Sequence, residues 1–147
     1  MIKVTPLKQE YKQKLIDIAS QGLTQSQVES IKTDLSATSC DFEYLVCLDE
    51  TEQVIGFSKT TPLTKGYLKL DCIYVAPNLR RDQNGSVILV AVMQRAVNAL
   101  TVGIFTECDQ SNKETLAFFK ARGFTCYQVQ NGIHYFTKSL LPMYKHE

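Results

Sequence analysis

The sequence predicts an α+β fold in which strands and helices alternate along the 147 residues of the chain. Two segments carry this prediction. Residues 67–76 are rich in β-branched and aromatic residues, as strands are, and a glycine-bearing turn separates them from a long apolar helical run at 86–100. Residues 112–124 then have the pattern of a capped amphipathic helix, with Asn112 at its start and Gly123 as its stop.

The first part of the chain predicts a short strand followed by two helices. The strand covers residues 2–4, and residues 8–20 carry apolar side chains at helical spacing. Thr24 and Gln27 have the spacing of a capping box at the start of a second helix. The apolar face of that helix consists of Val28, Ile31 and Leu35.

Further strands complete the order of elements. They are expected at residues 43–48, 53–58, 102–108, 124–129 and 133–138. Asn131 and Gly132 form a tight hairpin turn between the last two, because this pair readily adopts the positive φ angles of such turns. The resulting order is β-α-α-β-β-β-α-β-α-β-β.

Length and composition fit a single domain over residues 1–147, since 44% of the residues are hydrophobic and can bury a core. The 16 basic and 15 acidic residues are spread without long runs, which argues against nucleic acid or a membrane surface as the main partner. No bilayer-spanning stretch or signal peptide is evident. The five cysteines form no C-x-x-C pair and no cluster with histidine, so we expect free thiols in a cytoplasmic protein and no metal site.

The helix at 112–121 carries a motif with fixed offsets: an asparagine, a small residue, an aromatic pair and a Gly-Phe end. Its residues are Asn112, Thr115, Phe118, Phe119, Gly123 and Phe124. This spacing resembles the acyl-CoA-side helix of the GNAT N-acyltransferase superfamily, N-x-x-A-x-x-F-Y-x-x-x-G-F. The element order is similar to that of the same family. The resemblance implies a three-layer α/β GNAT fold, with a central mixed sheet whose central strands splay apart between flanking helices.

The turn before the 86–100 helix is a partial match to the family pattern Q/R-x-x-G-x-G/A. Arg80 fits the first position and Gly85 the last, whereas Gln83 stands where the middle glycine is usual. A strand, a turn and a helix start in this order aim backbone N–H groups and the positive helix end at an anion.

The resemblance implies acetyl-CoA as co-substrate, without a metal. The implied cofactor-binding residues are Ile73, Tyr74, Val75, Arg80, Arg81, Gln83, Asn84, Gly85, Ser86, Asn112, Phe118 and Phe119. Plainer roles stay open for several of them. In that case the two arginines are solvated loop charges and Asn112 is only a helix cap. Phe118 and Phe119 are then core aromatics, which is the favoured interpretation for Phe118.

The largest departure from the family is Phe119, which replaces a tyrosine that protonates the departing thiolate. The thiolate then leaves unaided, another tyrosine takes over, or the protein binds acyl-CoA with little turnover. The candidate replacements are Tyr74, Tyr127 and Tyr135. Asp71 and Glu107 are candidate general bases, although for either residue taken singly a solvated charge at a strand edge is the favoured interpretation. A lone histidine such as His134 is more often a packed or surface residue than a base.

The expected function is therefore N-acetyl transfer from acetyl-CoA to a primary amine, by direct attack in a ternary complex. The acceptor, a small molecule or a protein amine, carries no readable motif, and a homodimer stays open. The alternative is a degenerate GNAT-fold module that binds CoA or a protein without turnover. An enzyme for a longer acyl-CoA is a further option.

Overall fold

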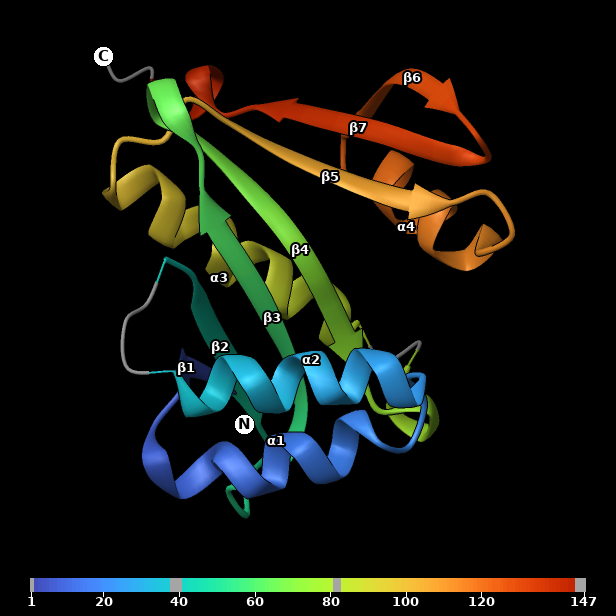
Figure 1. Cartoon of the computed structure of the whole chain (residues 1–147). Helices are drawn as coiled ribbons and strands as arrows, with labels where there is room; N and C mark the ends of the chain where they lie inside the picture. Colours follow the sequence, from blue (N-terminus) through green and yellow to red (C-terminus); the bar gives the residue numbers. More distant parts are fainter. Residues whose placement is uncertain (1, 38–40, 81–82, 145–147) are drawn as a thin grey trace. The chain divides into compact units, whose positions relative to one another are not determined.

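The computed structural model describes residues 2–37, 41–80 and 83–144. Their strands follow the order β1-β2-β3-β4-β5-β7-β6 in one mixed sheet, in which β4 and β5 are parallel (Figure 1). The chain divides into two compact units. The first comprises Met1–Thr60 and Cys72–Val92, and the second comprises Thr61–Asp71 and Met93–Glu147.

The first unit is built from two whole strands, two helices and parts of three further elements. Its elements are β1 (Lys3–Pro6), α1 (Lys12–Ala19), α2 (Gln25–Ser36), β2 (Glu43–Leu48), most of β3 (Val54–Pro62), the end of β4 (Tyr67–Val75) and the start of α3 (Asn84–Asn98). Short 3-10 turns precede α1 and follow β4, at Gln9–Tyr11 and Pro77–Leu79. β2 pairs with β1 and with β3, and a bulge interrupts the second ladder between Cys47 and Leu48.

The predicted capping box starts α2. The Thr24 hydroxyl accepts a hydrogen bond from the Gln27 N–H at 3.2 Å, and the Gln27 side chain accepts one from the Thr24 N–H at 2.8 Å. This satisfies two N–H groups that the helix itself cannot pair. The apolar face, Val28, Ile31 and Leu35, is buried as predicted.

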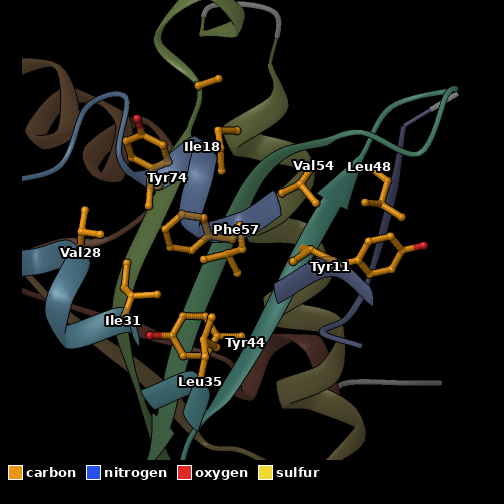
Figure 2. Packing of buried hydrophobic residues seen from close by; sticks show 14 residues of the cluster. Tyr11, Ile18, Val28, Ile31, Leu35, Tyr44, Leu48, Val54, Phe57 and Tyr74 are labelled. Carbon is orange, nitrogen blue, oxygen red and sulfur yellow. The ribbon is translucent and has the colours of Figure 1, made fainter. Parts of the chain in front are cut away.

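The core of the first unit lies between α1 and α2 on one side and the strands on the other. Phe57 is fully buried there, and its ring lies 6.2 Å from that of Tyr44 and 5.4 Å from that of Tyr74, centroid to centroid (Figure 2). At the edge of this core Asp34 accepts hydrogen bonds from the Tyr44 hydroxyl at 2.6 Å and the Lys59 ammonium at 2.7 Å. These polar contacts hold α2 against β2 and β3.

The second unit is a four-stranded sheet packed on one short helix. It holds the start of β4, the end of α3, β5 (Gly103–Asp109), α4 (Lys113–Ala121), β6 (Thr125–Gln130) and β7 (Ile133–Ser139), with 3-10 turns at Thr64–Gly66 and Leu141–Tyr144. β5 pairs with β7 from Gly103↔Ser139 to Asp109↔Ile133. The β6–β7 hairpin turns at Asn131 (φ 53°) and Gly132 (φ 79°), which confirms the predicted tight turn.

The ends of α4 also agree with the sequence prediction. The Asn112 side chain accepts a hydrogen bond from the Thr115 N–H at 3.2 Å, so it caps the helix. Gly123 has a φ of 90°, the left-handed conformation that ends many helices. A side chain at this position would also meet the Lys138 ammonium, 2.7 Å from the added Cβ.

Several element bounds differ from the prediction, among them the end of β3 and the start of α3. β3 runs to Pro62 rather than to residue 58, because its polar end still pairs with β2, through Tyr44↔Lys59 and Glu43↔Thr60. α3 begins at Asn84 rather than at residue 86. No helix among the described residues is sufficiently long and apolar to span a bilayer.

Candidate active site

The start of α3 in the first unit offers a helix terminus for an anion. The Val87 N–H donates a hydrogen bond to the carbonyl of Gln83, the residue before the helix, at 3.1 Å. Asn84, Gly85 and Ser86 form the first turn of the helix, and the backbone N–H groups of a first turn point towards the N-terminal end of the helix. The helix dipole adds partial positive charge at the same end, so this turn is suited to a phosphate group.

Gln83 explains how the turn forms without the usual middle glycine. Its φ is 63°, in the left-handed region that glycine adopts freely and other residues adopt at a cost. A glutamine thus adopts a backbone conformation that favours glycine, at the position where the family pattern has its middle glycine. The predicted ligand Arg81 and its neighbour Asp82 lie outside the described residues.

Arg80 lies close to the end of β4. Its Nε donates a hydrogen bond to the Val75 carbonyl at 2.8 Å, and its guanidinium carbon lies 5.2 Å from the centre of the Tyr74 ring. A guanidinium has five N–H donors, so one bond to Val75 leaves it able to hold a phosphate as well. Phosphate binding by Arg80 stays a prediction.

The end of β4 packs closely against β3 within the first unit. Val75 is buried and Ile73 is half-buried, and the Ala76 N–H donates to the Ile55 carbonyl at 2.9 Å. A Cβ at Gly56 would lie 2.6 Å from the Tyr74 carbonyl oxygen and 2.9 Å from Ile88. Glycine is therefore required at position 56 for β3 to approach this part of β4.

Tyr74 carries a buried polar group that has no partner in the described part of the chain. The residue is 5% exposed, and its hydroxyl makes no hydrogen bond to another described residue. The hydroxyl points away from Phe57 (Figure 2) and lies against Gly22, in the turn between α1 and α2. Burial raises the pKa of Tyr74, and the positive charge of Arg80 opposes that rise. The hydroxyl therefore keeps its proton at neutral pH and is available as a donor.

The two candidate bases share one lysine in the second unit. The Lys69 ammonium lies 3.5 Å from a Glu107 oxygen and 4.0 Å from an Asp71 oxygen. The other Asp71 oxygen accepts a hydrogen bond from the Thr61 hydroxyl at 2.5 Å. The sequence analysis did not include Lys69, although its two-residue spacing from Asp71 puts both side chains on the same face of a strand.

The β4–β5 pairing in the second unit changes at Leu70. The parallel ladder runs from Tyr67↔Gly103 to Lys69↔Phe105. At the next residue the Leu70 carbonyl accepts a hydrogen bond from the buried Thr106 hydroxyl at 2.8 Å. A side chain thus satisfies a strand carbonyl here, as the predicted separation of the two strands requires.

The aromatic pair of α4 is divided between core and surface. Phe119 is 2% exposed, and its ring lies 5.1 Å from that of Phe124 and 5.8 Å from that of Phe136. Phe118 is only half-buried, with the Arg122 guanidinium 5.2 Å from its ring centre. The favoured interpretation of Phe118 as a core aromatic is therefore wrong. Phe119, for which a core role was also open, is buried because its side chain faces β7. The cofactor contacts predicted for Asn112, Phe118 and Phe119 stay predictions.

The two other tyrosines proposed as replacement acids lie together in the second unit. The rings of Tyr127 and Tyr135 are 6.4 Å apart, and Tyr127 is exposed. Their hydroxyls are thus in a wetter environment than that of Tyr74. This contrast favours Tyr74 among the three candidates, because a buried donor interacts more strongly with a developing charge.

Comparison with known proteins identifies the family. A model of the acetyltransferase (GNAT) family matches residues 10–124, while no curated protein sequence matches the chain. Similar solved structures include a protein described as a GNAT-family acetyltransferase from Desulfovibrio desulfuricans (TM-score 0.83, 15% identity, 95% of this chain and 99% of that one). A second is the PaiA N-acetyltransferase of Thermoplasma acidophilum in complex with coenzyme A (TM-score 0.81, 16% identity, 95% of this chain and 99% of that one). A third is a GNAT-family acetyltransferase of Staphylococcus aureus (TM-score 0.79, 13% identity, 95% of this chain and 99% of that one). At these identities the structures establish a shared fold, whereas the family model covers more than half of the chain. The chain therefore belongs to the GNAT family of acetyltransferases and is an acyltransferase with the fold of that family.

Proposed function

We propose that this protein transfers an acetyl group from acetyl-CoA to a primary amine, within a ternary complex and in the cytoplasm. The main support for the proposal is the position of the start of α3. It follows β4 and an arginine-bearing turn, as a phosphate site requires, and it lies within the residues that match the family. The free thiols of the four described cysteines, Cys47, Cys72, Cys108 and Cys126, support the compartment.

In this proposal the first-turn N–H groups of α3 hold the pyrophosphate of acetyl-CoA. Asn84, Gly85 and Ser86 supply them, and Arg80 and Arg81 add positive charge. The Asn84 side chain donates to the Leu79 carbonyl at 3.0 Å and so fixes the turn that presents these groups. By the family resemblance, the backbone of Ile73 to Val75 faces the acyl group, and Asn112 and Phe118 lie along the pantetheine.

The chemistry needs a neutral amine, a stabilised oxyanion and a tolerable leaving group. The amine nitrogen forms a bond to the thioester carbon, and the carbon–sulfur bond then breaks to release the thiolate. We assign the Tyr74 hydroxyl as the donor that meets the negative charge. Because the pKa of Tyr74 is raised above 10 whereas that of an ordinary thiol is ~8.5, this hydroxyl donates a hydrogen bond rather than its proton.

The amine proton needs an acceptor, and we favour Glu107 over Asp71. Both Asp71 oxygens are engaged, by Lys69 and Thr61, whereas a single Glu107 oxygen faces Lys69 among the described residues. Glu107 is also the more exposed carboxylate, with 45% of its side chain accessible against 23%. It is therefore the better placed of the two to reach an amine brought by a substrate.

The proposal is tested by following thiol release from acetyl-CoA in the presence of a panel of primary amines. We expect amine-dependent release, and an acetylated product by mass spectrometry. CoA binding is measured separately by calorimetry with Gly85→Glu and Gly85→Ala. The glutamate variant should lose binding through like charge, and the alanine variant should retain most of it. Binding without release for every amine would instead indicate a binding module, and binding that survives Gly85→Glu would move the phosphate site elsewhere.

A further inference from the structure

A cysteine and a histidine meet on the β6–β7 hairpin of the second unit, and the proposed acetyl transfer does not involve them. The Cys126 sulfur lies 3.8 Å from Nδ1 of His134, although eight residues separate the two in sequence. A bulge between Cys126 and Gln128 shifts the β6–β7 register at this point, and the Cys126 sulfur also lies 3.5 Å from the Gln128 carbonyl oxygen. The imidazole is thus close enough to take the thiol proton.

The imidazole is held in place and the thiol is accessible. The His134 ring stacks on that of Phe136, with centroids 6.3 Å apart and planes 26° apart, and Phe136 is fully buried. Cys126 belongs to β6, the last strand in the order of the sheet, and is half-buried rather than enclosed. A small reagent can therefore reach its sulfur while the histidine stays oriented.

The two buried thiols among the described residues, Cys47 and Cys108, lack this combination. Cys108 lies opposite His134 on β5, but it is only 8% exposed and its sulfur faces the carbonyls of Asp109 and Asn112 at 3.4 and 3.8 Å. Burial raises the pKa of Cys108, and burial raises the pKa of the fully enclosed Cys47 to about 11. Both are therefore held as unreactive thiols.

We propose that Cys126 and His134 form a site of thiol–disulfide exchange with low-molecular-weight disulfides. His134 Nδ1 takes the proton of the Cys126 thiol, and the thiolate sulfur attacks one sulfur of the small disulfide. The disulfide bond breaks as the new S–S bond forms, and the released thiolate takes up a proton. Cys126 is oxidised to a mixed disulfide, and one half of the small disulfide is reduced to a free thiol. A thiol restores Cys126 by the reverse exchange.

The test uses the full-length protein and oxidised glutathione, with site-resolved mass spectrometry of all five cysteines. The rate at Cys126 is compared in the wild type, in His134→Phe, which keeps a ring to stack on Phe136, and in His134→Gln. Cys72 is the matched control, because it is also a half-buried strand cysteine. Cys47 reports on folding, since it reacts only if the core opens.

We expect a several-fold loss of rate at Cys126 in both histidine variants, with Cys72 unchanged and Cys47 unmodified. Equal rates at Cys126 in all three proteins would overturn the proposal. If Cys47 reacts in a histidine variant, that variant has opened its core, and the proposal is then tested with the wild type alone. Its Cys126 should then react faster in the native protein than in the chain unfolded in urea, and a slower native rate would exclude assistance by His134.

Discussion

The contact between Gly22 and Tyr74 allows a sharp test of the proposed site. A Cβ added at Gly22 would lie 2.5 Å from the Tyr74 hydroxyl oxygen and 3.3 Å from two ring carbons. Gly22→Ala therefore forces the ring or the α1–α2 turn to move, and overpacking of this kind costs about 1–3 kcal/mol. Tyr74→Phe removes a buried hydroxyl that has no partner among the described residues. Because no hydrogen bond compensates the desolvation of such a group, we expect this variant to be as stable as the wild type or more stable by ~1 kcal/mol.

The two changes should not be additive. In the Tyr74→Phe background the atoms nearest the added methyl group are ring carbons at 3.3 Å, which need to shift by only a few tenths of an ångström. The cost of Gly22→Ala should then fall below ~1 kcal/mol. For a cost of ~2 kcal/mol in the wild-type background, the middle of the expected range, the coupling free energy between the sites is then more than ~1 kcal/mol.

Urea denaturation of the wild type, both single variants and the double variant measures this cycle, and acetyl transfer is followed in parallel. Additivity within ~0.5 kcal/mol would refute the contact. The turnover rate of Tyr74→Phe tests the proposed role of the hydroxyl in acetyl transfer. If Tyr74→Phe raises stability and leaves kcat unchanged, the hydroxyl is no donor to the reacting atoms.

Four further predictions follow from individual residues. Above about pH 9 the free energy of unfolding should fall, by ~2–3 kcal/mol towards pH 11. The reason is that Cys47 has a pKa of about 11 in the folded protein, whereas the same thiol ionises near 9 in the unfolded chain. Stability is measured against pH in the wild type and in Cys47→Ala, which should lose this component. Gln83→Gly should relieve the left-handed strain and raise or preserve stability, within ~1 kcal/mol, without loss of CoA affinity by calorimetry; weaker binding would show that the glutamine side chain itself contacts the ligand. Phe119→Tyr adds a hydroxyl to a ring that is 2% exposed, so thermal unfolding should show a loss of about 1–3 kcal/mol in the ligand-free protein; unchanged stability would mean that the hydroxyl finds a partner. Glu107→Gln should lower the rate of acetyl transfer near neutral pH and recover it at high pH, whereas Asp71→Asn should have the smaller effect; the reverse ranking would assign the base to Asp71.

Much of the fold could be predicted from the sequence, because helix ends and tight turns depend on neighbouring residues. The capping box at Thr24, the cap at Asn112, the stop at Gly123 and the Asn131–Gly132 turn each depend on residues within a few positions of one another. Such signals act through backbone conformation and nearby N–H groups, so they do not depend on the rest of the chain. The motif at 112–124 added the family, which the match over residues 10–124 confirms.

The site depended on contacts that local patterns do not encode. Tyr74 and Gly22 are 52 positions apart by their numbers, and the packing of the α1–α2 turn on β4 leaves the hydroxyl without a partner among the described residues. The pairing of β4 with β5 likewise brings Glu107 to Lys69.

The sequence by itself determined the elements, their order and the family, because those are written in near-neighbour spacing and in motif residues. Only the tertiary structure decided that Phe119 rather than Phe118 is buried, that Gln83 carries a positive φ, and that Cys126 meets His134. Each of these depends on strand register and on the shape of the surrounding core, which arise from the whole chain together.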